Sequence, residues 1–173
     1  KRTVAWDESH RRYTWTADGR LTDGVVDSLG LNGAKPAATP AVKQPSATRG
    51  ADEPLGEDGR NWVRRAVGSL GYVAFDRPDI QYQTKNLQSE AARATQGTIT
   101  RLRMLGRYMV GRPRLSWTFP MPTTTPDALE AYADSDWASK ETERKSTTSV
   151  VIKLGDSMVE ASSATQGVIA LSS

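Results

Sequence analysis

Two aspartates, one residue apart, are the side chains of this sequence most suited to chemistry. Asp134 and Asp136 come at the end of an alternating run, residues 128–133, which predicts a strand ending near Asp134. Side chains two residues apart on a strand share one face, so we expect both carboxylates on the same side. Such oxygens suit hard divalent cations, Mg²⁺ or Mn²⁺, which need further ligands from other elements. The alternative is a solvated turn or cap, a position that Asp favours.

Basic residues gather in the middle of the chain and acidic ones at its C-terminal end. The net charge is +3, but residues 59–126 hold eleven Arg or Lys against three Asp or Glu, and residues 127–173 hold four against eight. This charge distribution is consistent with a basic segment that binds a phosphate backbone and an acidic segment that binds a metal ion. The alternative is a solvated, arginine-rich helix face. The side chains that we expect to contact nucleic acid are Arg64, Arg65, Arg101, Arg103, Arg107, Arg144 and Lys145.

The elements before these residues begin with a small folded piece and a linker. Residues 3–6 and 12–16 predict a hairpin, and the apolar spacing over residues 21–29, ended by Gly30, predicts a short helix. Residues 31–59 contain four prolines and almost no large apolar side chain, so they predict an extended linker. His10, the only histidine, lies in a polar turn without a neighbour in sequence that would activate it, and we assign it no catalytic role.

Three helices and several strands are predicted beyond residue 60. Apolar spacing predicts helices from Asn61 to about Ala74, from a cap at Asp76 to about Ser89, and across residues 99–109. Residues 115–119 predict a connecting strand, and residues 147–153 and 158–162 predict a hairpin. The fold class expected is therefore α+β.

Composition excludes several classes of protein. Cysteine is absent, which removes disulfide frameworks, thiolate zinc sites and cysteine nucleophiles. No run approaches the roughly 18 apolar residues of a membrane helix, and no apolar core follows the first three residues as in a signal peptide. We therefore expect a soluble, intracellular chain with no membrane partner.

Several blocks of the sequence, in the same order, resemble the Pol polyproteins of copia-type retrotransposons. The runs YADSDWA at 132–138, RKSTTS at 144–149 and VIALSS at 168–173 are similar to the opening of the RNase H domain in that family. VGSLGYVA at 67–74, followed by RPDI at 77–80, resembles the segment after the polymerase active site. KPAATP at 35–40 resembles the turn before the helical region. The resemblance covers residues 12–173.

This resemblance implies a division into four parts. Residues 1–30 would end the polymerase palm, 31–59 form the linker, 60–126 form a basic helical region like the thumb and connection, and 127–173 form the N-terminal half of an RNase H-like domain. The sheet would be antiparallel and incomplete, with three strands, and Val168 to Ser173 would begin its first helix. Asp134 matches the first-strand catalytic aspartate and metal ligand of the family, and Asp136 matches a supporting position.

The partners implied are a template–primer duplex or an RNA–DNA hybrid and the remainder of the Pol polyprotein, in a cytoplasmic particle or the nucleus. Neither active site of the family is whole, however. RNase H chemistry uses two metal ions held by about four carboxylates, and the next ligand of the family would follow Ser173. Nothing before Lys35 resembles the aspartate pair of the polymerase. Val150, Ala161 and the pair Ala164-Thr165 stand where the family has Gly, Trp and two Lys.

We interpret the chain as a fragment of a retrotransposon reverse transcriptase and RNase H. The intact parent would synthesise DNA on RNA and cleave RNA in RNA–DNA hybrids with Mg²⁺ or Mn²⁺, and the chain alone would be inactive. The alternative is a non-catalytic basic module, derived from such an element, that binds nucleic acid or acts as a scaffold. A third possibility is a decayed element that folds poorly.

Overall fold

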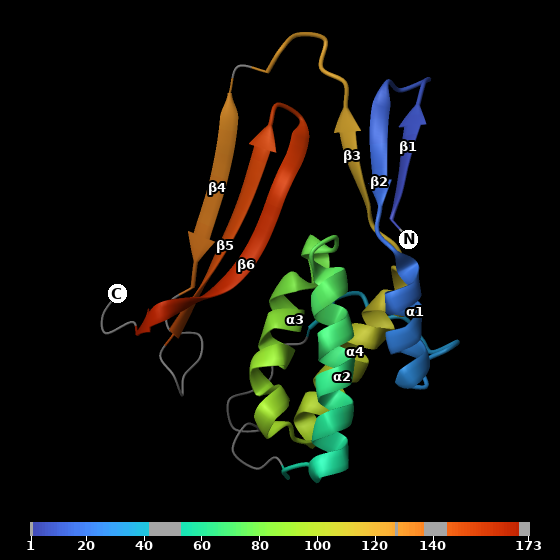
Figure 1. Cartoon of the computed structure of the whole chain (residues 1–173), viewed down its shortest axis with the longest axis vertical. Helices are drawn as coiled ribbons and strands as arrows, with labels where there is room; N and C mark the ends of the chain where they lie inside the picture. The colour runs from blue at the N-terminus through green and yellow to red at the C-terminus, as the bar shows by residue number, and fades with distance from the viewer. Residues whose placement is uncertain (1, 42–52, 127, 137–144, 170–173) are drawn as a thin grey trace. The chain divides into compact units, whose positions relative to one another are not determined.

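A computed structural model of the chain describes residues 2–41, 53–126, 128–136 and 145–169. The chain divides into two compact units (Figure 1). The helical unit comprises Lys1–Arg2 and Thr16–Leu115, and the strand unit comprises Thr3–Trp15 and Ser116–Ser173. Helices and antiparallel sheets thus occupy separate units, and the fold class is α+β, as the sequence predicts.

The described residues of the helical unit form four α-helices: α1 (Gly19–Ser28), α2 (Glu57–Ala74), α3 (Pro78–Glu90) and α4 (Gln96–Gly111), with the short 3₁₀ helix η2 (Ala91–Arg93) between α3 and α4. Helix α2 packs against α1 and α3, and α4 packs against the same two helices. Helices α2 and α4 therefore lie diagonally across the unit, with α2 in front of α4 in Figure 1.

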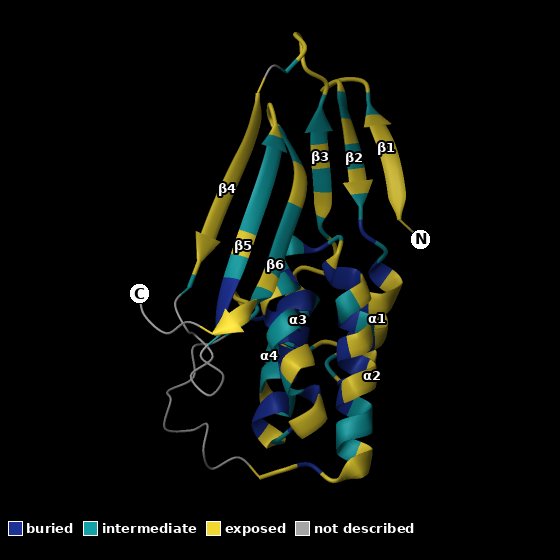
Figure 2. Cartoon of the chain, turned by 60° about the vertical axis from the view of Figure 1, so that its left-hand side comes forward, coloured by how far each residue is buried: buried dark blue, intermediate teal, exposed yellow. Residues whose placement is uncertain are grey.

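The buried apolar cluster lies in the helical unit. Leu70 of α2, Leu87 of α3 and Leu102 and Leu105 of α4 are fully buried, and they meet between the helices. The strands carry no buried apolar side chain among the described residues, and Figure 2 shows the dark blue of burial concentrated in the helices. Because apolar burial is the main favourable term in folding, the helical unit holds most of the stabilising contacts.

The helix starts follow local signals with one exception. The α4 helix begins with a reciprocal capping box between Thr95 and Thr98. Proline occupies the first turn of α3, as expected, but the cap residue is Arg77, so the prediction of a cap at Asp76 is wrong. The Asp76 carboxylate instead accepts a hydrogen bond from Arg2 Nε at 2.6 Å, which holds the N-terminus on the helical unit.

Both ends of the segment expected to be a linker pack against helices. The backbone N–H of Ala37 donates to the Arg107 carbonyl at 3.1 Å, and Ala37 is buried. Leu55 is buried as well, and α2 begins at Glu57. The structure therefore anchors residues 31–41 and 53–56, and the rest of that prediction, residues 42–52, lies outside the described residues.

The first sheet of the strand unit has the order β1-β2-β3, formed by β1 (Thr3–Asp7), β2 (Arg12–Thr16) and β3 (Ser116–Pro120). The expected hairpin at the N-terminus and the expected strand after the helices are confirmed. The Met121 N–H donates to the Arg11 carbonyl at 2.8 Å, and the Ala17 N–H donates to the Leu115 carbonyl at 3.3 Å. These two bonds fix β2 and β3 as antiparallel neighbours.

The second sheet joins β4 (Leu129–Ser135), β5 (Lys145–Leu154) and β6 (Ser157–Ile169) in that order, with both pairs antiparallel. Gly155, with a φ of 55°, makes the turn between β5 and β6, where a side chain would be strained. The expectation that Val168 begins a helix is wrong. Strand β6 continues through Ile169, which pairs with Lys145 beyond a break in register. Pairing with β5 therefore overrides the helix start that the family pattern implied.

Candidate nucleic-acid and metal-binding residues

Asp134 lies near the end of β4, at the edge of the second sheet. Its backbone is paired with Ser149 of β5, which is paired with Ser163 of β6. Asp134 is exposed, and no hydrogen-bond or ion-pair partner among the described residues engages its carboxylate. The side chain is therefore open to solvent and to any ligand, as a metal-binding or catalytic carboxylate must be.

Asp136 stabilises the pairing of β4 with β5. Its carboxylate accepts a hydrogen bond from the Thr147 N–H at 2.6 Å, and its own N–H donates to the Thr147 carbonyl at 3.0 Å. These two bonds extend the β4–β5 ladder past the last residue of β4. One carboxylate oxygen is thereby engaged, which separates Asp136 in role from its neighbour Asp134.

The carboxylates around Asp134 do not fit a two-metal centre. Among the described residues, no group of three or more His, Cys, Asp or Glu side chains lies close enough together to hold a metal ion. The residues opposite Asp134 across the sheet are Ser149 and Ser163, whose hydroxyls are weak ligands for Mg²⁺ compared with carboxylates. A two-metal reaction needs several carboxylates, so we derive no hydrolytic step from this sheet.

Helix α4 carries three arginines and no acidic residue. Arg103 is exposed, and Arg107, one turn further on, is partly exposed. Arg107 donates from Nε to the Lys35 carbonyl at 2.8 Å, which orients its guanidinium. In the described part of the chain no carboxylate pairs with either side chain, and α4 itself contains no acidic residue.

The other predicted basic residues are distributed over several surfaces. Arg101 pairs with Glu90, so part of its charge is neutralised. Arg64 and Arg65 are exposed on α2, diagonal to α4, and Arg64 donates to the Asn61 side chain at 3.1 Å. Lys145 begins β5 in the strand unit, and Arg144 lies outside the described residues. Within the helical unit, the structure therefore brings together Arg101, Arg103 and Arg107, but places Arg64 and Arg65 elsewhere.

A buried ionic network was not foreseen from the sequence. Arg77 is fully buried and donates two hydrogen bonds to Asp79, at 2.9 and 2.8 Å, while the Tyr108 hydroxyl donates to the same carboxylate at 3.0 Å. Burial and the neighbouring Asp79 carboxylate raise the pKa of Tyr108. The short spacing of Arg77 and Asp79 is a signal that could have indicated this pair, but nothing in the sequence indicates Tyr108, which comes from α4.

Gln83 of α3 is the second residue that the sequence did not single out. It is 5% exposed, it lines a pocket beside the arginines of α4, and no described residue hydrogen-bonds to its side-chain amide. The amide is not among the fully buried polar groups without a partner, so it keeps access to the pocket. No periodicity or motif would have marked this position.

Comparison with known proteins identifies relatives along most of the chain. The retrovirus-related Pol polyprotein from transposon RE2 of Arabidopsis thaliana is 32% identical over 158 residues, which is 91% of this chain and 10% of the polyprotein. The corresponding polyprotein from transposon RE1 of the same plant is 32% identical over 133 residues, 77% of this chain and 9% of the polyprotein. An uncharacterized mitochondrial protein of that plant is 25% identical over 96% of this chain and 67% of that protein.

The fold and its candidate residues define an α+β chain with a cationic helix surface and a solvent-open aspartate on a sheet edge. The chain is a relative of the copia-type, retrovirus-related Pol polyproteins of transposons, as its sequence motifs imply. It spans about a tenth of the length of those two polyproteins. No family model matches the chain, and no solved structure matches it. In the described residues no helix is long and apolar enough to cross a membrane.

Proposed function

We propose that this chain is a nucleic-acid-binding segment of a retrotransposon Pol protein. The helical unit would act as a polymerase thumb-like element, and the second sheet would be the start of an RNase H-like domain. The intact parent would synthesise DNA on RNA and cleave RNA in RNA–DNA hybrids. The partners would be a template–primer duplex or hybrid and the remainder of the Pol polyprotein.

The observation that carries this proposal is the unpaired positive surface of α4. Arg103 and Arg107 are spaced by four residues, so they are neighbours on one helix face. Like charges at that spacing destabilise a helix by about 0.2–0.5 kcal/mol, and no described acidic side chain compensates them. A row of backbone phosphates would supply the missing negative charge and release bound counterions.

Asp134 would contribute to the metal chemistry of the parent. An exposed strand-end carboxylate without a partner suits a ligand for Mg²⁺ or Mn²⁺ once further carboxylates join it. Asp136 would support the strand geometry through its bonds to Thr147. We expect no hydrolysis from this chain alone, because its described carboxylates do not cluster.

The test is binding and cleavage of an RNA–DNA hybrid by the wild-type chain and two variants. We expect Arg103→Ala to weaken hybrid binding roughly fivefold, the effect of about 1 kcal/mol from one exposed charge contact. Asp134→Ala should leave binding unchanged, and no variant should cleave the hybrid in Mg²⁺. Cleavage by the wild-type chain that is lost in Asp134→Ala would overturn the proposal that the chain alone is inactive. Binding by Arg103→Ala as tight as that of the wild type would overturn the proposal that the α4 surface binds the hybrid.

A non-catalytic nucleic-acid-binding or scaffold module is the second candidate. The use of the Asp136 carboxylate to hold β5 favours it, because this motif residue acts in folding. This candidate predicts the same binding through α4, but it also predicts that Asp134→Ala does not change hybrid cleavage by the full-length Pol protein. Loss of hybrid cleavage by full-length Pol on Asp134→Ala would reject it.

A further inference from the structure

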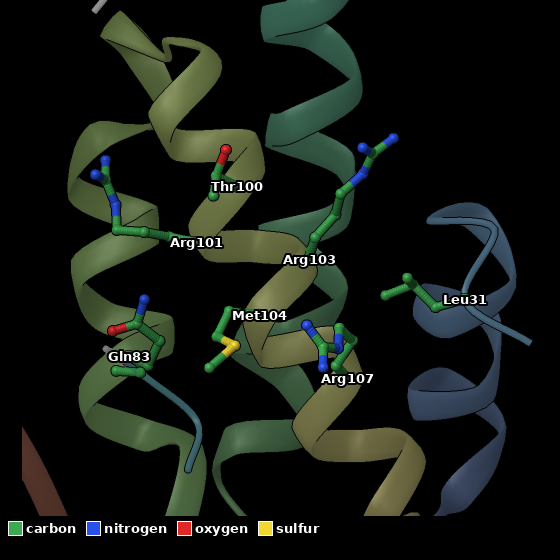
Figure 3. Close-up of a pocket in the computed structure, with 8 residues that line it drawn as sticks. Leu31, Gln83, Thr100, Arg101, Arg103, Met104 and Arg107 are labelled. Atoms are coloured by element: carbon green, nitrogen blue, oxygen red, sulfur yellow. The ribbon is translucent and has the colours of Figure 1, made fainter. Parts of the chain in front are cut away.

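A pocket of about 360 Å³ lies on the helical unit between α3 and α4. Figure 3 shows Gln83 on one side, Met104 in the middle, and Arg103, Arg107 and Leu31 on the other. The volume is at the lower end of the range for small-molecule sites, about 300–1,000 Å³. The pocket therefore has the size of a site for one small organic group.

The chemistry of the pocket is divided between charge and apolar surface. Arg103 and Arg107 provide guanidinium groups without a described acidic partner, which suits a phosphate. Met104 and Leu31 provide an apolar floor, and a thioether makes favourable contacts with an aromatic ring. A ligand that joins an anionic group to a flat ring would contact both the guanidinium groups and the apolar residues, whereas free phosphate would contact only the guanidinium groups.

Gln83 supplies the third and most specific element. The residue is only 5% exposed, its side-chain amide has no hydrogen-bond partner among the described residues, and the amide is not among the fully buried groups, so it can be reached from the pocket. An unpartnered amide on the pocket wall can donate to and accept from a ligand that enters the pocket. A glutamine amide offers a donor and an acceptor side by side, which is the arrangement that pairs with adenine N6 and N7.

We propose that this pocket binds a single adenine nucleotide unit. The phosphate would lie against Arg103 and Arg107, the ring would lie over Met104, and the Gln83 amide would recognise the adenine edge. The unit is either a free nucleotide or the unpaired end of a nucleic-acid strand. This binding does not depend on the proposed duplex binding, although both use the α4 arginines.

The test is calorimetric titration of the whole chain with adenosine monophosphate, adenosine and inorganic phosphate. We expect the nucleotide to bind roughly tenfold or more tightly than either half. Gln83→Met keeps the side-chain length and removes the amide, so it should weaken the nucleotide roughly threefold to tenfold. It should also abolish the preference for adenosine over guanosine monophosphate, which a purely structural role would not do. The matched control is Arg93→Ala, which removes an exposed charge away from the pocket.

A second comparison distinguishes a free nucleotide from the unpaired end of a strand. Tighter binding of a duplex with a single-stranded adenine overhang than of a blunt duplex, lost in Gln83→Met, would assign the pocket to a strand end. Nucleotide binding without that gain would assign it to a free nucleotide. A nucleotide that binds no better than phosphate, with Gln83→Met unchanged, would overturn the proposal. Blunt-duplex binding should not respond to Gln83→Met, so failure here is distinct from failure of the duplex surface.

Discussion

The network of Arg77, Asp79 and Tyr108 shows how single residues stabilise the helical unit. Arg77 is fully buried, and the Asp79 carboxylate is its charge partner. The network joins the start of α3 to the end of α4. A buried charge without a partner is strongly destabilising, so the carboxylate is more important to the fold than a surface ion pair would be.

Removing the Asp79 carboxylate should therefore reduce the stability of the fold much more than removing the Tyr108 hydroxyl, which donates a hydrogen bond to it. We expect Asp79→Ala to lower the free energy of unfolding by about 3–5 kcal/mol, because it leaves the Arg77 guanidinium buried and unpaired. Tyr108→Phe should cost about 1 kcal/mol, the value of one hydrogen bond. Urea unfolding followed by far-UV circular dichroism measures both. Arg93→Ala, on the surface, should change the free energy by less than about 0.5 kcal/mol. An Asp79→Ala variant as stable as this control would contradict the assignment.

The Tyr108 hydroxyl also predicts a dependence of stability on pH. Burial and Asp79 raise the pKa of this phenol in the folded state above its ordinary value of about 10. Its stabilising contribution is therefore complete below pH of about 10 and is lost as pH rises through the folded pKa, because the unfolded state releases the proton first. Urea unfolding of the wild type and Tyr108→Phe across this range should give free energies that converge at alkaline pH. A constant difference between them would contradict the shift.

The close contact between α4 and the segment after α1 depends on a glycine. A Cβ on Gly106 would lie 2.5 Å from Leu31 Cδ1 and 2.8 Å from Leu29 Cδ1, closer than atoms approach. Gly106 therefore lets this segment reach α4, where Ala37 bonds to Arg107. By contrast, a Cβ on Gly68 of α2 would meet nothing within 4 Å.

These two glycines make a matched pair of substitutions. Gly106→Ala should lower the free energy of unfolding by about 1–3 kcal/mol, because the Leu29 and Leu31 side chains must move. Gly68→Ala should raise it by up to about 1 kcal/mol, since alanine is the better helix former and space is available. Thermal unfolding of both variants beside the wild type measures the difference. Equal effects of the two substitutions would contradict the close approach at Gly106.

The sequence predicted elements with strong local signals and missed features that depend on distant contacts. Apolar spacing located α3 and α4 closely, and turn residues located the β5–β6 hairpin. Asp76 has the chemistry of a cap, but Arg2, 74 residues away, takes its carboxylate. Val168 and Ile169 extend β6 because pairing with β5 reaches that far. Gln83 and Tyr108 were missed because their roles come from the packing of α3 against α4.

Burial and charge are distributed unevenly between the two units of the chain. The helical unit contains the buried apolar cluster and the arginines of α4. The strand unit contains the open carboxylate of Asp134, and its described strands bury no large apolar side chain. The proposed nucleic-acid surface and the proposed metal ligand Asp134 therefore belong to different parts of the chain. Variants in one unit should leave the property of the other intact.

We propose that α4 holds nucleic acid through Arg103 and Arg107, and the salt dependence of binding tests this proposal most directly. The measurement is the slope of log affinity against log salt concentration for an RNA–DNA hybrid, with the wild type, Arg103→Ala combined with Arg107→Ala, and Arg93→Ala as the charge control. The slope is negative, and each lost phosphate contact reduces its magnitude by about 1. We therefore predict that the magnitude falls by about 2 in the double variant and changes little in the control. Equal slopes for all three proteins would contradict the account.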